Sequence, residues 1–316
     1  MRIFMTGASG YIGRVVAEHA LGQGHAVIGL ARNAQTADRL VKAGVTPLEG
    51  SLLSGELLTK AASEADGVIH LGIDYGVGSF EEIMSSDKAA VRALAAGLAG
   101  TGKGLITTSG TGVAAPAADG GETNEDAPLW ENPILRLRGE AEADARSLAA
   151  DGVRVAAIRL PPFVYGRGGS SFVPALLKAA IKNDFAPYIG TGTLLTSAVD
   201  VDEAAKLYLL ALEKASAGVA FNATTERDIP LRALAETIGA ATGVPARSLP
   251  RAEVEALLGP FITIFLDTSS RPSSERAVRQ LGWRPAPTLS LLRDISHGSY
   301  GEAISQFKRD VTSSHS

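Results

Sequence analysis

The chain has 316 residues, of which 45% are hydrophobic, a formal net charge of −4 and no cysteine. This length and hydrophobic content suffice for one large α/β domain or for two lobes with a filled core. The slightly acidic balance argues against a nucleic-acid partner and against an anionic membrane surface. The lack of cysteine excludes disulfides, thiolate catalysis and thiolate metal sites, and it favours a reducing, cytoplasmic location.

Neither a membrane segment nor a metal site is expected. No run of the sequence reaches the ~20 consecutive apolar residues that a membrane helix needs. The N-terminus runs directly into a short apolar strand pattern and has no signal-peptide pattern. No two of the five histidines are spaced as zinc ligands are. We therefore expect a small-molecule substrate as the partner, without a metal or a membrane.

Short apolar runs and helical patterns alternate along the first half of the chain. The expected strands are 3–5, 26–30, 45–48, 67–71, 104–108 and 153–160, and the expected helices are 15–21, 34–43, 53–64, 79–98 and 132–150. Such alternation, with right-handed crossovers, gives a doubly wound parallel sheet, the Rossmann arrangement. The fold class is therefore predicted to be α/β.

The alternation of strand and helix patterns changes after residue 160, where helical patterns are separated by only short extended segments. This change predicts a smaller, mostly helical lobe that binds the substrate. We therefore divide the chain into a dinucleotide-binding domain at 1–160 and a substrate-binding lobe at 161–316. Two later segments, 197–201 and 219–222, are expected to return to the sheet of the first domain.

A glycine-rich turn, TGASGYIG at residues 6–13, follows the first expected strand. Gly7 permits a tight turn, Gly10 lets the backbone approach a pyrophosphate, and Gly13 lets the following helix pack closely on the strand. The helix N-terminus would offer free N–H donors and a partial positive charge to the phosphates. The spacing G-x-x-G-x-x-G differs from the commonest dehydrogenase pattern, but the strand, turn and helix around it indicate a dinucleotide site.

Several separated motifs resemble those of the extended and atypical short-chain dehydrogenase/reductase superfamily, in particular its NAD(P)-dependent epimerase/dehydratase-like members. Besides the glycine turn they are ADGVIHLG at 65–72, TTSGT at 107–111, RLPPFVYG at 159–166, AVDVDEAA at 198–205 and SSERAVRQLGWRP at 273–285. The motifs span nearly the whole chain. The resemblance implies a nicotinamide cofactor on the parallel sheet and a substrate cleft beside it.

The resemblance also implies which nicotinamide cofactor is used. The second strand usually ends in an acidic residue that binds the ribose 2′-hydroxyl of NAD, but here Ala31 is at that place and Arg32 follows. A guanidinium can hold a 2′-phosphate through forked hydrogen bonds, so we expect NADP(H) rather than NAD(H). The alternative is that Arg32 only caps a surface turn. The other expected cofactor contacts are Gly7, Ser9, Gly10, Tyr11, Ile12, Gly13, Ser51, Leu52, Leu71, Gly72, Arg138, Phe163 and Val164.

Superfamily members that move a hydride usually use a serine together with tyrosine and lysine in a Y-x-x-x-K pair. Ser109 matches the serine, whereas Ile134 and Arg138 occupy the tyrosine and lysine positions. Arginine can bond the ribose hydroxyls, but it cannot shuttle a proton near neutral pH. The resemblance therefore implies a site without its usual acid, in which another side chain supplies the proton, water does, or the reductase chemistry is lost.

Two tyrosines are candidate proton donors, because Tyr75 and Tyr165 follow the fourth and sixth expected strands. Packing or substrate lining is the alternative for each. The glycine-rich loop 166–171 is expected to line the substrate cleft, and His70 is interpreted as a hydrogen-bonded core residue. The expected catalytic residues are Ser109, Arg138 and Tyr165, and the expected substrate contacts are Tyr75, Thr111 and Tyr188.

Three functions are compatible with these residues. The first is an NADP(H)-dependent oxidoreductase that transfers a hydride to or from the carbonyl or alcohol carbon of a small to medium apolar substrate. The second is a sugar-nucleotide epimerase or dehydratase, and the third is a catalytically silent NADP(H)-binding redox sensor. Helices rich in small residues, at 87–100 and 141–150, predict a possible homodimer.

Overall fold

A computed structural model describes residues 1–313. Seven parallel strands form the main sheet in the order β10-β6-β5-β4-β1-β2-β3. They are β1 (Arg2–Thr6), β2 (Ala26–Ala31), β3 (Thr46–Glu49), β4 (Gly67–His70), β5 (Gly104–Gly110), β6 (Arg154–Leu160) and β10 (Val219–Asn222). The predicted doubly wound α/β fold is confirmed.

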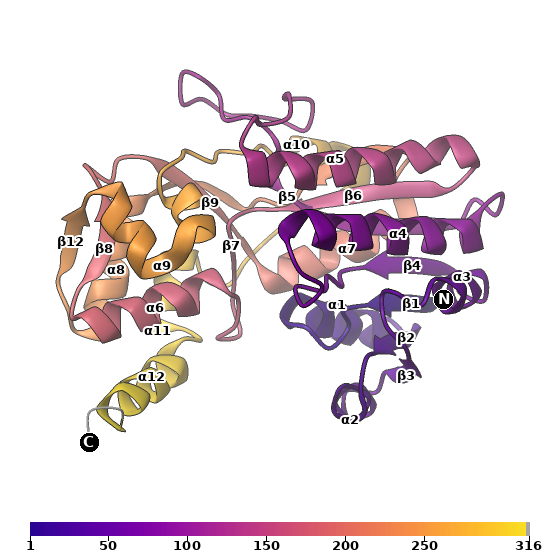
Figure 1. Cartoon of the computed structure of the whole chain (residues 1–316), viewed down its shortest axis with the longest axis horizontal. Coiled ribbons are helices and arrows are strands. Elements are labelled where there is room, and N and C mark those ends of the chain that lie inside the picture. The colour runs from indigo at the N-terminus through magenta and orange to yellow at the C-terminus, as the bar shows by residue number, and fades with distance from the viewer. Residues whose placement is uncertain (314–316) are drawn as a thin grey trace.

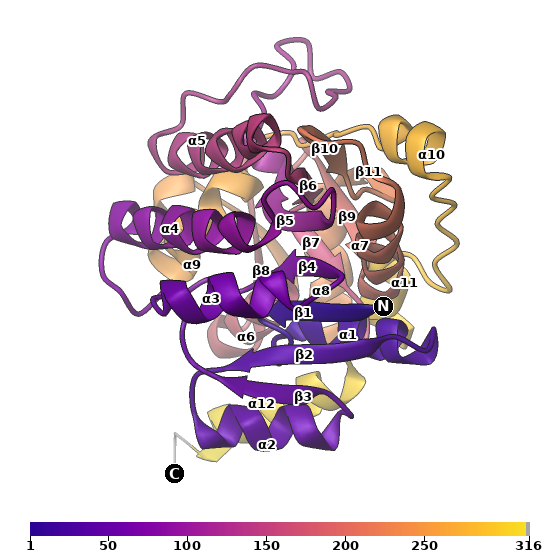
Figure 2. The same cartoon turned by 90° about the vertical axis from the view of Figure 1, so that its right-hand side faces the viewer.

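Helices cover both faces of this sheet, as Figures 1 and 2 show. One layer consists of α1 (Tyr11–Gly22), α2 (Ala34–Lys42) and α7 (Val201–Lys214). The other consists of α3 (Gly55–Ser63), α4 (Phe80–Leu98) and α5 (Pro133–Ser147). A strand buried on both faces is apolar nearly throughout, which explains the continuous hydrophobic runs of β1 and β4.

The second lobe has two small sheets with helices around them (Figure 1). The order of its three-stranded sheet is β11-β9-β7, and β12 pairs with β8. Its strands are β7 (Phe163–Tyr165), β8 (Ala186–Ile189), β9 (Leu195–Asp200), β11 (Glu226–Pro230) and β12 (Ala246–Leu249). Its helices are α6 (Phe172–Asn183), α8 (Leu231–Thr242), α9 (Arg251–Leu266), α11 (Leu291–His297) and α12 (Gly301–Ser313).

The single boundary after residue 160 is too simple. The segment 219–222 is β10 and pairs with β6 in the main sheet. The segment 197–201 does not join that sheet, because β9 pairs with β7 and β11 in the second lobe. Helix α7, helix α10 (Glu275–Leu281) and the buried Trp283 all pack into the core of the first lobe. The chain therefore crosses between the lobes more than once.

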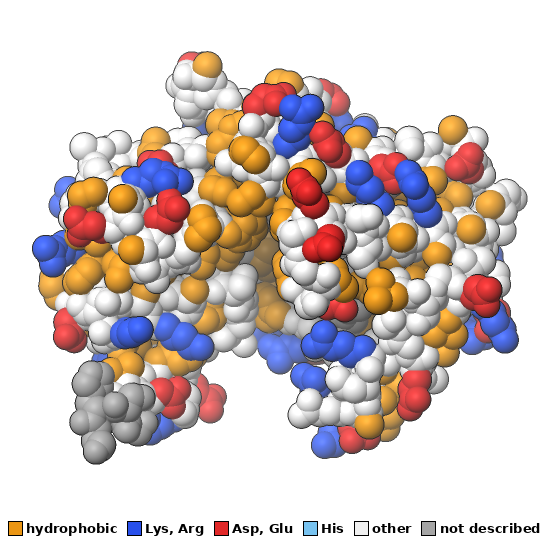
Figure 3. All heavy atoms as spheres, in the orientation of Figure 1, with side chains coloured by type: hydrophobic (Ala, Val, Ile, Leu, Met, Phe, Trp, Pro, Cys, Tyr) orange, Lys and Arg blue, Asp and Glu red, His pale blue; other side chains and the backbone are white. Residues whose placement is uncertain are grey.

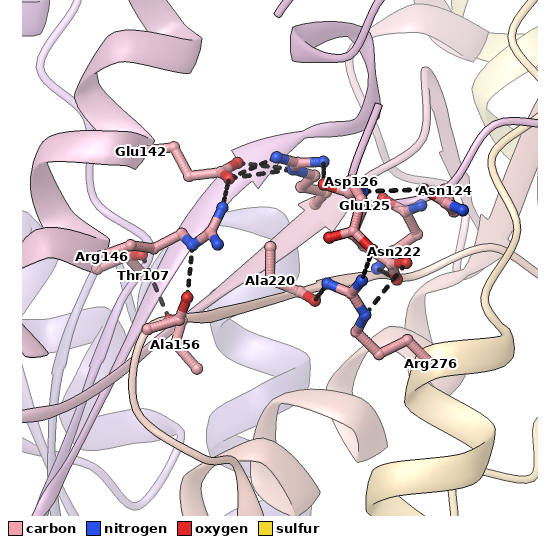
Figure 4. Close-up of polar contacts among 12 residues, drawn as sticks. Thr107, Asn124, Glu125, Asp126, Glu142, Arg146, Ala156, Ala220, Asn222 and Arg276 are labelled. Atoms are coloured by element: carbon pink, nitrogen blue, oxygen red, sulfur yellow. Dashed lines mark hydrogen bonds and ion pairs between the residues drawn. The ribbon is translucent and has the colours of Figure 1, made fainter. Parts of the chain in front are cut away.

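Charged side chains hold the loop between β5 and α5 against the sheet (Figure 4). Arg159 of β6 forms hydrogen bonds to the carboxylate of Glu142 on α5, the shortest of 2.7 Å, and to the backbone carbonyl of Glu125. The Glu125 carboxylate accepts from the backbone N–H of Asn222 at 2.8 Å. Arg276 of α10 forms an ion pair with the carboxylate of Asp126 in the same loop. The buried pair of Arg159 and Glu142 holds α5 on β6, and the other contacts hold the loop.

The described residues contain neither a membrane-spanning helix nor a cluster of metal-binding side chains. Within residues 1–313 no helix combines the length and the apolar character that spanning a membrane requires. The same residues contain no cluster of three or more histidine, aspartate or glutamate side chains arranged to hold a metal ion.

Candidate active site

A groove of about 360 Å³ lies at the carboxyl ends of β1, β2 and β4. Helix α1 begins there, and no side chain caps its N-terminal N–H groups. Such free donors bind phosphate groups. The groove is lined by the expected residues Gly7, Ser9, Gly10, Arg32, Ser51, Leu52, Leu71 and Gly72, together with Leu30, Thr36, Arg39, Gly50, Ile73 and Asp74.

The glycines of the turn are required by close backbone contacts. Gly7 has a φ of +70°, and a Cβ atom on it would lie 2.7 Å from the backbone nitrogen of Gly72. A Cβ atom on Gly13 would lie 2.0 Å from the carbonyl oxygen of Gly7. Both distances are far inside van der Waals contact, so neither position tolerates a side chain. With its open groove and free helix N-terminus, the turn fits the pyrophosphate of a dinucleotide.

Tyr11 connects the glycine turn to the second lobe. Its hydroxyl donates a hydrogen bond of 2.7 Å to the carbonyl of Gly166, and a Cβ atom on Gly169 would lie 2.1 Å from its ring. The loop 166–171 therefore packs on the first turn of α1. The expectation that this loop lines the substrate cleft is corrected, because no residue of the loop lines the cavity, and Tyr11 together with Ser299 and Tyr300, in the turn between α11 and α12, holds it elsewhere. Ile12 packs against the core beneath the turn.

Two arginines border the adenosine end of the groove. Arg32 follows β2, as expected, and Arg39 reaches the same wall from α2. Sequence reasoning missed Arg39. The available signal was its spacing of three residues from Thr36, which places both residues on one face of α2. Thr36 also lines the groove, and its backbone N–H is capped by the side chain of Asn33 at 2.8 Å.

A second cavity, of about 260 Å³, adjoins the groove, and both share the walls Leu71, Gly72 and Ile73. Ser109 lines it with a side chain only 6% exposed and a hydroxyl that has no hydrogen-bond partner. A buried hydroxyl without a partner is costly unless a ligand completes it. Ser109 is therefore placed to bond a ligand in the cavity.

Thr111 and Tyr75 lie beside this site. The hydroxyl of Thr111 is also buried without a partner, but Thr111 lines a small neighbouring recess that shares Gly112 and Phe265 with the cavity. Tyr75 lines the cavity itself, and it is 69% exposed, so its ring lies at the mouth. The structure thus brings Tyr75 together with Ser109, whereas Thr111 lines the adjacent recess.

Arg138 reaches the same cavity from α5. Its guanidinium donates to the backbone carbonyl of Thr108 and lies 3.4 Å from the carboxylate of Asp87 on α4. Burial favours the neutral acid of Asp87, but the hydrogen bond from His70 and the nearby charges of His70 and Arg138 outweigh it and lower the pKa of this carboxyl. Arg138 and Asp87 therefore form an ion pair at the inner wall of the cavity.

His70 connects this ion pair to the glycine turn. Its Nε2 atom lies 3.0 Å from the carboxylate of Asp87, and its Nδ1 atom lies 2.8 Å from the hydroxyl of Thr6. The Thr6 hydroxyl in turn accepts from the backbone N–H of Gly72 at 3.0 Å. At 2% exposure and with both nitrogens bonded, His70 is a hydrogen-bonded core residue, as the sequence indicated.

The opposite end of the cavity is apolar and aromatic. Phe261 and Phe265 of α9 lie one helical turn apart, with ring centroids separated by 5.4 Å. Phe80 and Leu135 contribute from α4 and α5. Figure 3 shows hydrophobic side chains gathered around the hollow between the two lobes. The wall of the cavity therefore combines polar side chains with apolar and aromatic ones.

Several expected site residues lie away from the cavity. Tyr165 is fully buried, its hydroxyl donates to the carbonyl of Leu289, and burial together with the charge of Glu226 raises its pKa. The expectation that it donates the proton is corrected, because its hydroxyl points into the core of the second lobe. Tyr188 lies on β8, within a separate recess of that lobe. The side chains of Phe163 and Val164 are buried in the two cores, and neither residue lines the groove or the cavity.

Asp87 and the two phenylalanines of α9 were also missed from the sequence. Asp87 occupies a position on the apolar face of α4, four residues after Ile83 and four before Val91, and all three side chains are buried. A charged residue at such a position signals a buried partner. The phenylalanines repeat at a helical spacing of four, which by itself indicates only packing.

Comparison with known families identifies the fold and its relatives. The profile of the NAD dependent epimerase/dehydratase family matches residues 3–224. The chain belongs to this family. Its members depend on a nicotinamide dinucleotide, which agrees with the groove and its glycine turn.

Two similar proteins and one similar structure each cover more than three quarters of the chain. An uncharacterized protein of Schizosaccharomyces pombe is 36% identical over 95% of this chain and 100% of its own length. The 2-alkyl-3-oxoalkanoate reductase of Stenotrophomonas maltophilia is 28% identical over 78% of this chain and 77% of its own length. A UDP-glucuronic acid 4-epimerase from Bacillus cereus has the same fold, with a TM-score of 0.75 over 97% of this chain and 99% of its own, at 19% identity. The chain is thus similar in sequence to a reductase and similar in fold to an epimerase.

Proposed function

We propose that this chain is an NADP(H)-dependent oxidoreductase that reduces the carbonyl group of a small to medium apolar substrate, or runs the reverse oxidation. The observation that carries the proposal is the buried, unpartnered hydroxyl of Ser109 in a cavity that shares a wall with the dinucleotide groove. A hydroxyl donor at that place stabilises negative charge that develops on a carbonyl oxygen.

The N-terminus of α1 would hold the pyrophosphate, and Arg32 and Arg39, which line the groove, would hold the 2′-phosphate. Arg138, which lines the adjoining cavity, would bond the hydroxyls of the nicotinamide ribose. The bound cofactor supplies or accepts a hydride. Two guanidinium groups beside the adenosine end support NADP(H) over NAD(H), because no carboxylate follows β2 to bind a free 2′-hydroxyl.

The sugar-nucleotide alternative has less support from the cavity. A nucleotide diphosphate carries more negative charge than one guanidinium balances, and Arg138 is the single arginine or lysine that lines the cavity among residues 1–313. The third alternative, a redox sensor, predicts cofactor binding without turnover. A cytoplasmic location and a homodimer formed through α4 and α5 stay predictions.

One experiment tests the proposed reaction. NADPH oxidation is followed by stopped-flow fluorescence with a panel of aldehydes and ketones, in the wild type and in Ser109→Ala. We expect turnover in the wild type and a loss of about 100-fold in kcat for Ser109→Ala, with the NADPH affinity unchanged. Ser86→Ala is the matched control, because Ser86 also has a buried, unpartnered hydroxyl but does not line the cavity. NADPH binding without oxidation on the whole panel would contradict the proposal and favour the sensor.

A further inference from the structure

The titratable side chains at the inner end of the substrate cavity, among the described residues that line it, are His70, Asp87 and Arg138, and each has a hydrogen-bond or ion-pair partner. Both ring nitrogens of His70 are occupied, by Asp87 and by Thr6. The hydroxyl of Thr108 donates to the carbonyl of His70 at 2.8 Å. None of these groups has a proton free to give to a substrate beside Ser109.

The remaining groups hold charge and do not release protons. The carboxyl of Asp87 is ionised, because His70 and Arg138 lower its pKa. Arg138 keeps its proton at every physiological pH. Tyr75 is the one phenol that lines the cavity in the described chain, and its ring lies exposed at the mouth. The hydroxyl of Ser109, beside the guanidinium, can therefore stabilise an oxyanion without protonating it.

A site that stabilises an oxyanion without protonating it distinguishes two classes of carbonyl substrate. Hydride addition to a saturated ketone produces an alkoxide, a strong base that needs a general acid as it forms. Hydride addition to a conjugated carbonyl compound produces an enolate or a phenolate, whose charge is delocalised. Such an anion is a much weaker base, so it persists under hydrogen bonding until water supplies the proton.

Building on the oxidoreductase proposed above, we propose that the cavity reduces conjugated carbonyl compounds, namely enones and quinones, and binds the resulting oxyanion at Ser109 and Arg138. The enone accepts a hydride at its β-carbon, the C=C π pair moves toward the carbonyl, and an enolate oxygen forms while NADPH becomes NADP⁺. Water then protonates the α-carbon and leaves hydroxide. A quinone accepts the same hydride, which carries two electrons and one proton, and becomes a hydroquinone monoanion. This anion takes its second proton from water, which leaves hydroxide.

The apolar end of the cavity suits a planar acceptor. The rings of Phe261 and Phe265 meet edge to face, at an interplanar angle of 79°, and both line the cavity. Phe261 is 42% exposed, so a ligand ring can cover part of it. Contacts between aromatic rings stabilise by about 0.5–1.5 kcal/mol beyond the burial of area. A volume of about 260 Å³ accommodates a one-ring or two-ring substrate.

The first test compares matched substrates in the full chain with NADPH. Cyclohexenone is paired with cyclohexanone, and duroquinone is added as a quinone; the lack of cysteine in the chain removes thiol addition as a side reaction. We expect kcat/KM to be at least about tenfold higher for cyclohexenone and to be flat between about pH 6 and 9, without a limb from a protein acid. Equal or faster reduction of cyclohexanone overturns this inference and leaves the proposed oxidoreductase standing. NADPH that binds but is oxidised by neither compound overturns both.

The second test needs no turnover. 4-Nitrophenol is titrated with the protein in the presence of NADP⁺, and its phenolate is followed by visible absorbance. We expect the phenolate to bind about tenfold more tightly than the neutral phenol, and Ser109→Ala to remove most of this preference. The control Ser86→Ala is expected to keep it. Equal binding of the two forms, or preference for the neutral phenol, overturns the oxyanion site.

Discussion

The dinucleotide groove and the substrate cavity share a wall, but they are built differently. The phosphate end of the groove is made by the backbone of one contiguous segment, residues 6–13, and its key contacts lie between main-chain atoms. The cavity is made by residues from separated parts of the chain, namely the end of β4 and the loop after it, β5, α4, α5 and α9, held by hydrogen bonds and an ion pair. The difference teaches that a backbone site is fixed by local sequence, whereas a side-chain site depends on how helices pack.

The largest effect is expected from a change to the backbone site. In Gly13→Val the side chain would overlap the carbonyl of Gly7, so α1 must move away from β1. We expect a loss of about 3 kcal/mol in the free energy of unfolding, measured in urea, and no detectable NADPH binding by fluorescence titration. Gly22→Ala in the same helix is the control, because nothing lies near its Cβ position. Normal NADPH affinity in Gly13→Val would show that the groove tolerates rearrangement and would remove the contrast with the cavity.

A change to the ion pair tests the side-chain site. Arg138→Ala leaves the buried carboxylate of Asp87 with His70 alone. We expect the unfolding free energy to fall by about 2 kcal/mol and the turnover to fall by more than about tenfold. The double variant Arg138→Ala, Asp87→Ala is expected to be more stable than Arg138→Ala alone, since it removes the unpaired charge. Additive losses would show that the two residues act independently.

The pH dependence of stability provides a related test on Asp87. Its folded pKa is lowered, so the ionised carboxylate stabilises the fold above its unfolded pKa of about 3.9, and this contribution is lost as the pH falls through the folded value. Wild type is therefore expected to be more stable than Asp87→Asn at pH 7, and the difference is expected to shrink below about pH 4. Thermal melts at both pH values measure it. A difference that grows in acid would contradict the assigned ion pair.

The strand, turn and helix that form the phosphate end of the groove could be predicted from the sequence for a physical reason. Strand, turn and helix lie within one local segment, and the three glycines carry most of the geometric requirement, so no long-range packing had to be known. The alternation of strands and helices gave the main sheet in the same way. The segment 197–201 was predicted wrongly because the pairing partner of a short strand depends on tertiary structure: β9 meets β7, which lies beyond the first lobe.

The side-chain site could be predicted only in part. Ser109 and Arg138 follow from positions in the chain relative to strand and helix ends. The direction of Tyr165 could not be deduced, because its hydroxyl reaches Leu289, which is 124 residues further along the chain. The role of Asp87 could not be deduced, because its ion-pair partner Arg138 lies on a different helix, α5. Each failure concerns where a side chain points after helices pack, which a sequence motif does not encode.

A smaller effect is expected at the adenosine end of the groove, where side chains act from the surface. Arg32→Ala is expected to weaken NADPH binding by about tenfold and to leave NADH binding unchanged, since only NADPH carries a 2′-phosphate. Lys42→Ala is the control, because Lys42 lies on α2 but does not line the groove. Isothermal titration calorimetry measures the affinity of each variant for NADPH and for NADH. Equal losses of affinity for NADPH and NADH would show that Arg32 supports the loop and does not bind the 2′-phosphate.

The smallest effect is expected on the outer face of the helices that build the cavity. Arg92 of α4 pairs with Asp144 of α5 at 2.5 Å, but the Arg92 side chain is largely exposed. Solvent and side-chain entropy weaken such a pair, so Arg92→Ala is expected to cost about 0.5 kcal/mol and to leave turnover within about twofold. Light scattering and unfolding at two protein concentrations test whether the same face pairs in a dimer, since a dimer would make the loss concentration-dependent. A monomer that loses turnover in Arg92→Ala would show that the cavity depends on the outward contact of α4 and α5 as well as on the inward one.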